Sequence, residues 1–306
     1  MKVFRSFSEA RGIRNPVVTT GSFDGVHIGH KTILKRLRAL AEMHNGESVL
    51  ITFDPHPRKV LYPDTAGKDL KLILSQKEKL ELLSEAGLDN IIIIEFTKDF
   101  ARTTSEEFVR DFLTGSLGAR VIVVGFNHHF GFNKEGDYKQ LWEWQKKYGF
   151  LAEEIPEQDV ENETVSSTKI RKAISEGYIQ RANAYLDHFY IVIGLPEKYS
   201  CEICSELPQF FNIDFRDDCK LLPSPGIYAV TAESDVYCSK AMAVIIKEPE
   251  KQPALLAHFF EELINDSDRN LRLSFHKRVQ GSVNLQDPSN IARIHSAVKE
   301  ISELIY

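Results

Sequence analysis

Ten consecutive residues near the N-terminus, from Gly21 to His30, read Gly-Ser-Phe-Asp-Gly-Val-His-Ile-Gly-His. The glycines allow the backbone to approach a ligand closely. His27 and His30 are three residues apart, so on a helix that begins there both imidazoles lie one turn apart and can face the same phosphates. The start of a helix also favours an anion, because its N–H groups are unpaired and its dipole is positive there. The segment therefore predicts phosphate chemistry.

This segment differs from the two common phosphate loops. It lacks the Gly-Lys-Ser/Thr of a Walker A loop and the Gly-x-Gly-x-x-Gly of a dinucleotide fold. The alternative interpretation is a glycine-rich turn whose histidines pack or face solvent. We expect a phosphate ligand to be bound by the following residues: Gly21, Ser22, Phe23, Asp24, Gly25, His27, Gly29 and His30.

A second segment with phosphate-binding character runs from Thr164 to Arg171 and reads Thr-Val-Ser-Ser-Thr-Lys-Ile-Arg. Its hydroxyls, Ser167 and Thr168 among them, are followed by two cations at a predicted helix start, which makes a second anion cradle. Alone, the segment is equally typical of a routine helix cap followed by a solvated basic face. The first segment favours the functional interpretation.

The elements that must position these segments alternate along residues 1–185. Apolar strands are predicted at Val17–Thr20, Ser48–Phe53, Asn90–Phe96, Ala119–Gly125 and Phe150–Ile155. Helices are predicted at Lys31–His44, Gln76–Ala86, Thr104–Leu113, Tyr138–Tyr148 and Ser167–Glu176. Continuous apolar strands between amphipathic helices predict an α/β fold with a doubly wound parallel sheet covered on both faces. The ligand of such a sheet lies at the carboxyl ends of its strands, where the first segment begins.

The pattern changes after about Asp187. Short strands without intervening helices are predicted at Phe189–Ile193, Gly226–Ala232 and Ala241–Lys247, and one helix over Ser289–Leu304 closes the chain. We therefore expect two domains, residues 1–186 and a small β-rich domain over 187–306 with a C-terminal helix.

Composition fits two globular domains and excludes some partners. The chain has 306 residues, 42% hydrophobic and 27% charged, with a net charge of −6. That charge argues against a broad electrostatic grip on nucleic acid or an anionic membrane. The N-terminus lacks the apolar region of a signal peptide, and no stretch approaches the roughly 18 apolar residues of a membrane span. We expect a cytoplasmic protein.

The four cysteines are Cys201, Cys204, Cys219 and Cys238. The Cys-x-x-Cys pair could supply half of a zinc site, but the other two cysteines form no second close pair. We expect reduced thiols and no structural metal.

Four segments in order carry a family resemblance: Gly21–His30, Thr52–Pro57 (Thr-Phe-Asp-Pro-His-Pro), Val124–Gly131 (Val-Gly-Phe-Asn-His-His-Phe-Gly) and Ser167–Arg171. Together they resemble the FMN adenylyltransferase module of prokaryotic bifunctional riboflavin kinase/FAD synthetases, a branch of the nucleotidylyltransferases. The resemblance covers about residues 1–186. It implies transfer of an adenylyl group from ATP to FMN, giving FAD and pyrophosphate.

The resemblance also implies residue roles. His27 and His30 would bind the ATP phosphates and the transition-state oxygens, and Arg171, with Ser167 and Thr168, would hold the β- and γ-phosphates. Phe23 would line the nucleotide side, and Mg²⁺ would arrive bridging the phosphates. The residues expected to seat the flavin are Asp54, His56 and Asn127. His128 and His129 depart from the residues common in the family, and no role is assigned to them.

In that family the C-terminal domain is a riboflavin kinase with a six-stranded barrel. Its Pro-Thr-Ala-Asn motif is absent from the sequence, and Leu256 stands where the family has its Glu general base. Leucine cannot accept a proton, so we expect a kinase-like barrel that has lost kinase chemistry. Three alternatives stay open: a fully bifunctional enzyme, a non-catalytic regulator that binds flavin and nucleotide, or transfer to glycerol phosphate, pantetheine phosphate or nicotinate mononucleotide.

Overall fold

The computed structural model describes residues 1–126, 128–156, 159–160, 163–199, 207–215, 217, 219–247, 253–262 and 269–304. The chain forms two compact units. The first comprises Met1–Leu70 and Lys79–Val165, and the second comprises Lys71–Glu78 and Ser166–Tyr306. Residues 166–186 thus group with the C-terminal part of the chain, and the predicted module boundary after residue 186 stays a prediction.

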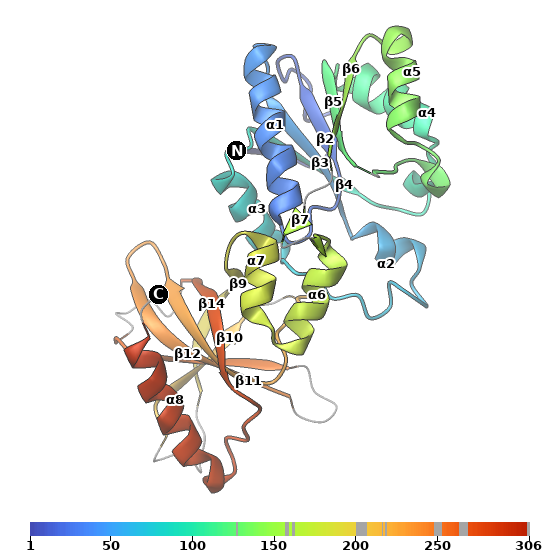
Figure 1. Ribbon diagram of the computed structural model, residues 1–306. Coiled ribbons are helices and arrows are strands. Elements are labelled where there is room, and N and C mark those ends of the chain that lie inside the picture. The colour runs from blue at the N-terminus through green and yellow to red at the C-terminus, as the bar shows by residue number, and fades with distance from the viewer. Residues whose placement is uncertain are drawn as a thin grey trace. The chain divides into compact units, whose positions relative to one another are not determined.

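The first unit contains a six-stranded parallel sheet, which confirms the predicted fold class (Figure 1). Its strand order is β1-β4-β3-β2-β5-β6. The strands are β1 (Lys2–Phe4), β2 (Val17–Thr20), β3 (Ser48–Asp54), β4 (Asn90–Glu95), β5 (Val121–Gly125) and β6 (Leu151–Ile155). The order reverses between β2 and β5, and the crevice at such a switch point is where open α/β sheets bind ligands.

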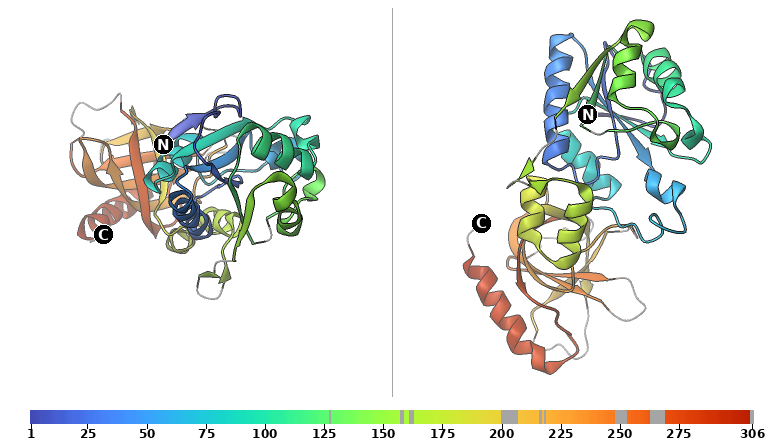
Figure 2. Two further views of the ribbon diagram at one scale, coloured as in Figure 1. Left: turned by 90° about the horizontal axis from the view of Figure 1, so that it is seen from above. Right: turned by 45° about the vertical axis from the view of Figure 1, so that its right-hand side comes forward.

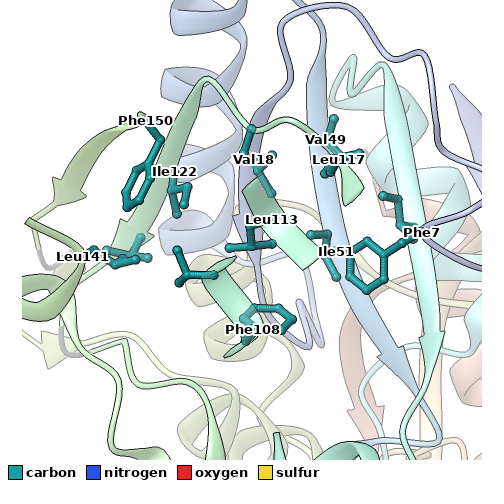
Figure 3. Packing of buried hydrophobic residues seen from close by; sticks show 14 of the residues in the cluster. Phe7, Val18, Val49, Ile51, Phe108, Leu113, Leu117, Ile122, Leu141 and Phe150 are labelled. Carbon is teal, nitrogen blue, oxygen red and sulfur yellow. The ribbon is translucent and has the colours of Figure 1, made fainter. Parts of the chain in front are cut away.

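Helices cover both faces of this sheet, because the four central strands, β2 to β5, are buried on both sides over most of their length. Helix α1 (Ile28–Met43) lies on one face, and its buried residues include Leu34, Leu37 and Leu40 (Figure 2). The other face carries α4 (Ser105–Glu107), its π-helical continuation η2 (Phe108–Ser116) and α5 (Tyr138–Tyr148). The core under this second face includes the residues labelled in Figure 3: Phe7, Val18, Val49, Ile51, Phe108, Leu113, Leu117, Ile122, Leu141 and Phe150.

Several predicted boundaries are confirmed residue by residue. Strand β2 and helix α5 begin and end as predicted, and Thr104 and Glu107 form the predicted capping box. The smaller elements of this unit are α2 (Pro57–Leu61), η1 (Phe100–Arg102), η3 (Phe132–Lys134), β7 (Asp159–Val160) and β8 (Glu163–Thr164). Helix α3 (Gln76–Glu85) crosses the division between the units, which falls between Glu78 and Lys79.

The second unit contains a closed antiparallel barrel with strand order β10-β13-β12-β11-β14-β9. Its strands are β9 (Tyr190–Tyr199), β10 (Phe210–Asp214), β11 (Gly226–Glu233), β12 (Cys238–Ile246), β13 (Ala254–Phe259) and β14 (Leu271–Gln280). Its helices are α6 (Ser167–Glu176), α7 (Ile179–Leu186), η4 (Pro288–Asn290) and α8 (Ile291–Glu303). The β-rich unit with a closing helix is therefore confirmed, and α6 spans the predicted residues. Strands β10, β13 and β14 have no counterpart among the predicted strands.

Helix α8 packs on the outside of the barrel against β12 and β14. Its buried Ile294, Ala297 and Ile301 share an apolar cluster with residues that project outward from the strands. Met242 and Leu256 belong to that cluster. The apolar face predicted for the last helix thus packs against the barrel.

A buried ion pair holds residues 71–78 to the barrel within the second unit. The side chains of Glu78 and Lys220 are both 0% exposed, and their charged atoms are 2.6 Å apart. Lys220 Nζ also donates to the carbonyl oxygens of Ile73 and Ile191, at 2.7 Å each. The second oxygen of Glu78 accepts from the N–H of Ile193 at 2.9 Å. A buried ion pair whose charged groups are hydrogen-bonded in this way fixes the segment to the barrel.

Within the residues that the structure describes, no helix combines the length and the apolar character needed to cross a membrane.

Candidate active site

The loop between β2 and α1 holds its residues in an unusual backbone conformation. Phe23, Gly25 and Val26 all have positive φ values, of 48°, 97° and 42°. Glycine readily adopts positive φ values, whereas a β-branched residue such as Val26 rarely does. Non-glycine residues held there cost free energy, and they concentrate at functional sites. The surroundings of the loop must therefore hold it in place.

The loop delivers two imidazoles and a phenyl ring in one stack. His27 is the residue that precedes the first turn of α1, and His30 lies in that turn. The ring centroids of His27 and His30 are 3.7 Å apart at 19°, and those of Phe23 and His30 are 4.3 Å apart at 22°. The two histidines thus lie side by side at a helix N-terminus, a position that favours an anion.

The surroundings of His30 keep its ring neutral. Burial lowers the pKa of His30 well below 6.5, and the positive charges possible on His27 and Lys79 lower it further. Its Nδ1 atom is buried and has no hydrogen-bond partner among the described residues. At neutral pH this imidazole is an uncharged group that can donate one N–H, and a bound anion would raise its pKa.

A cavity of about 550 Å³ opens beside the histidine stack, within the size range of small-molecule sites. Its lining includes residues of the loop and the start of α1, namely Gly21, Ser22, Phe23, His27, Gly29 and His30. Much of the remaining lining is aromatic: Phe53, Tyr62, Phe96, Phe100, Phe108, Phe126 and Phe130. The cavity therefore combines imidazoles and loop residues, which suit a phosphate, with aromatic side chains, which suit a flat ring system.

The other residues predicted around this loop are placed differently from one another. His56 lines the cavity, and its Nδ1 accepts a hydrogen bond from the N–H of Arg58 at 3.1 Å at the start of α2. Asp54 is exposed at the end of β3, and Asp24 and Gly25 are buried in the loop. Asn127 lies outside the described residues.

The second predicted segment forms the start of α6. Ser166 caps this helix, since its hydroxyl accepts from the N–H of Lys169 at 3.4 Å. Ser167, Thr168 and Arg171 follow in the first turns. All of them belong to the second compact unit, so their convergence with the histidines on one ligand stays a prediction.

Two further histidines line the cavity and were given no role from the sequence. His128 and His129 follow β5, the strand next to β2 at the switch point. His128 Nε2 lies 3.1 Å from the hydroxyl of Thr20. Burial lowers the pKa of His128 to about 4, with a contribution from His129. The sequence could have indicated these two histidines as site residues, because they come directly after a predicted strand and the carboxyl ends of neighbouring strands meet at one edge of the sheet.

Lys79 also lies at the site, although it was not among the site residues predicted from the sequence. This lysine of α3 is 9% exposed, and its ammonium reaches the hydroxyl of Thr52 at 3.3 Å and the carbonyl oxygen of Ser22 at 3.5 Å. Burial lowers the pKa of Lys79, while the charges of Asp24 and Asp54 raise it. A cation therefore lies directly behind the loop.

The described residues contain no group of three or more His, Cys, Asp or Glu side chains arranged to hold a metal ion. Cys201 and Cys204, the pair considered as half of a zinc site, lie outside the described residues.

Comparison with known proteins gives a consistent result over this region. The family model described as FAD synthetase matches residues 10–169, which are 160 of the 306 residues. A bifunctional riboflavin kinase/FMN adenylyltransferase from Listeria monocytogenes is 31% identical over 222 residues, 71% of this chain and 67% of that protein. An FAD synthetase from the same organism is 35% identical over 184 residues, 60% of this chain and 73% of that protein. The bifunctional enzyme of Escherichia coli K12 is 30% identical over 178 residues, or 58% of this chain and 56% of that protein.

Among solved structures, a protein described as a macrolide-efflux protein from Streptococcus pneumoniae matches with a TM-score of 0.86 over 100% of both chains. The two sequences are 21% identical, so this likeness shows the fold alone.

Proposed function

This chain belongs to the FAD synthetase family and is a nucleotidyltransferase, and we propose that it transfers the adenylyl group of ATP to the phosphate of FMN. The observation that carries the proposal is the stack of His27 and His30 at the start of α1, which opens on an aromatic-walled cavity. The products are FAD and pyrophosphate.

In the proposed reaction an oxygen of the FMN phosphate attacks the α-phosphorus of ATP. The bond between that phosphorus and the oxygen bridging to the β-phosphorus breaks, and the pyrophosphate leaves with the electron pair. Both substrates are anions, so the protein contributes position and charge stabilisation rather than a covalent intermediate. ATP would enter as its Mg²⁺ complex, and the ion would offset the negative charge of the phosphates while needing few ligands from the protein.

His27 and His30 are assigned to the phosphates of ATP. A neutral imidazole donates one N–H, and both rings lie where the helix dipole favours negative charge. Such donors stabilise the charge that develops on the phosphoryl oxygens as the bond breaks. The loop residues Gly21, Ser22, Phe23 and Gly29, which line the same cavity, are assigned to the phosphates with them.

Arg171, with Ser167 and Thr168, is assigned to the β- and γ-phosphates. A guanidinium matches two phosphate oxygens at once, which suits the departing pyrophosphate. The assignment rests on the match of Ser167–Arg171 to the family motif.

The aromatic part of the cavity is assigned to the isoalloxazine ring of FMN. Flat ring systems stack on aromatic side chains, and the volume of about 550 Å³ leaves room for one. His56 lies in this wall, and Asp54 and Asn127 are assigned to the flavin by the family motifs.

We further propose that the barrel does not phosphorylate riboflavin. Leu256, at the position of the family's general base, is 1% exposed and packs in the apolar cluster under α8. It cannot accept a proton, and the sequence lacks Pro-Thr-Ala-Asn. The FMN consumed would then come from another kinase.

One experiment tests both proposals. The purified chain is incubated with ATP, Mg²⁺ and either FMN or riboflavin, and the flavins are separated by chromatography. We expect FAD from FMN and no phosphorylated product from riboflavin. FMN or FAD formed from riboflavin would identify a bifunctional enzyme, and binding of FMN and ATP without pyrophosphate release would identify a regulator. Pyrophosphate release with pantetheine phosphate, glycerol phosphate or nicotinate mononucleotide in place of FMN would identify another acceptor.

A further inference from the structure

The burial of Lys79 lowers the stability of the fold. Its side chain is 9% exposed, and its ammonium has three donors but two long hydrogen bonds, of 3.3 Å and 3.5 Å. Neither acceptor is a carboxylate. Taking a cation out of water without a close counter-ion disfavours folding, so an apolar side chain of similar length would be less costly here.

Lys79 contacts the loop between β2 and α1, here called the histidine loop, both directly at Ser22 and through Thr52. The carbonyl oxygen of Ser22 accepts from Lys79 Nζ and also from the hydroxyl of Thr52, at 3.5 Å and 3.3 Å. Lys79 Nζ is in turn 3.3 Å from the Thr52 hydroxyl. These three groups form a closed triangle between α3, β3 and the loop. The triangle therefore fixes the loop where it leaves the sheet.

The residue fixed in this way precedes the strained part of the loop. Phe23, directly after Ser22, is the first of the three residues with positive φ, and its ring stacks on His30. A shift of the Ser22 carbonyl would release the peptide that sets the position of Phe23 and would disturb the ring stack. The same ammonium also places positive charge behind a site that must attract an anion.

We propose that Lys79 is a positioning residue for adenylyl transfer, which holds the Ser22 carbonyl so that the loop presents His27 and His30 to the phosphates of ATP. The inference rests on the proposed function, because it assigns Lys79 to that same site. It explains why a costly buried cation is kept: its cost to stability is offset by the geometry of the site.

The first test replaces Lys79 with methionine in the full-length chain, with Lys77→Met as the matched control. Lys77 lies on the same helix and is exposed. Because small misplacements of a site can cost up to about 100-fold in rate, we expect kcat for FAD formation to fall roughly 10- to 100-fold in Lys79→Met. The KM for FMN should stay within about threefold, because the substitution disturbs the alignment of the phosphates rather than the binding of the flavin. The melting temperature should stay equal or rise.

Unchanged kcat in Lys79→Met would overturn the proposal, and so would a fall in kcat explained by a lower melting temperature. Should Lys79→Met fail to fold, Lys79→Gln carries the same test, because its amide is neutral and one bond shorter than the lysine side chain, whose contact with the Ser22 carbonyl is already 3.5 Å long. We expect kcat to fall roughly 10-fold or more in Lys79→Gln as well, and an unchanged kcat in that folded variant would overturn the proposal.

A double-mutant cycle separates positioning from a general effect of charge. Thr52→Val removes the other donor to the Ser22 carbonyl, and residues of one hydrogen-bond network couple. If both groups hold that carbonyl, Lys79→Met and Thr52→Val together should lower kcat by clearly less than the product of their single effects. Strictly multiplicative losses would overturn the shared-anchor proposal.

Failure of the proposed function would be visible separately. A wild-type chain that makes no FAD from FMN would contradict the proposed function whatever Lys79 does. Calorimetry of ATP binding to the wild type and Lys79→Met would then still test the anchor: weaker binding to the variant is expected, and equal binding would overturn it.

Discussion

Two buried lysines in this chain have opposite surroundings. Lys220 makes three short bonds, to the carboxylate of Glu78 at 2.6 Å and to two carbonyl oxygens at 2.7 Å each. Lys79 makes two long bonds to uncharged oxygens, and the carboxylates of Asp24 and Asp54 act on it through space. The first lysine is satisfied by the fold, whereas the second is held beside a loop that lines a cavity.

The difference distinguishes a buried charge that stabilises the fold, Lys220, from one that supports a functional site, Lys79. A buried charge with complete partners is costly to break, because removing one ion leaves the other unpaired. A buried charge with incomplete partners already disfavours the fold, so its removal should cost function rather than stability. The comparison therefore makes opposite predictions for the same substitution at the two positions.

The largest effect is expected for Lys220→Met. Glu78 would keep its charge in a fully buried place without its cation, so the free energy of unfolding should fall by about 3–5 kcal/mol. Urea unfolding followed by circular dichroism measures the loss. Both tryptophans, Trp142 and Trp144, lie in the first unit, so their fluorescence reports that unit separately.

Lys79→Met is the counterpart in the same measurement, and we expect no decrease. Equal destabilisation by the two substitutions would remove the distinction between a structural and a functional lysine. A Lys220→Met variant as stable as the wild type would show that the buried pair contributes little beyond an apolar isostere.

The next effect concerns the loop that Lys79 supports. His30→Ala should lower kcat for FAD formation by roughly 10²–10³, since loss of one transition-state donor costs about 2.7–4 kcal/mol. His44→Ala, at the other end of α1, is the matched control and should leave the rate unchanged. A loss of less than about threefold for His30→Ala would show that this histidine does not stabilise the transition state.

Arg171→Ala tests whether residues of the second unit serve the same reaction. We expect a loss of up to about 10²-fold, mainly in kcat, because the guanidinium is assigned to the leaving pyrophosphate. Lys172→Ala provides the control, since that side chain is 75% exposed on the same helix. Unaltered pyrophosphate release by Arg171→Ala would confine the active site to the first unit.

Much of the first unit could be predicted because its central strands, such as β3, β4 and β5, are apolar on both faces. Continuous runs such as Asn90–Glu95 are hard to read as anything but a buried parallel strand. The histidine loop was likewise visible, since glycines and imidazoles within ten residues form a local pattern. The barrel was harder: β14 (Leu271–Gln280) is buried in its first half except for the half-buried Arg272, and its second half is only half-buried and carries Lys277 and Arg278, so no single periodicity describes it.

Lys79 could not be predicted, for a physical reason. Its neighbours Leu80, Leu82 and Leu83 suggest an amphipathic helix, and a lysine beside them is normally a solvated residue. Its contact with Ser22 spans 57 positions in the sequence and exists because β3 lies beside β2 in the sheet. Sequence pattern gives local structure, whereas this contact depends on topology.

The smallest predicted effect is a change in the titration of His30, which sharpens the comparison at the level of charge. A neighbouring ammonium disfavours a second cation, so the positive charge of Lys79 helps to lower the pKa of His30. Lys79→Met should therefore raise this pKa, but not to the value of an exposed histidine, because burial is the larger cause and remains. NMR titration of the imidazole signals measures the change, and Lys77→Met should leave it unaltered. An unchanged or lower pKa of His30 in Lys79→Met would mean that the lysine charge does not reach the histidine stack, and its influence would then be confined to its bonds with Ser22 and Thr52.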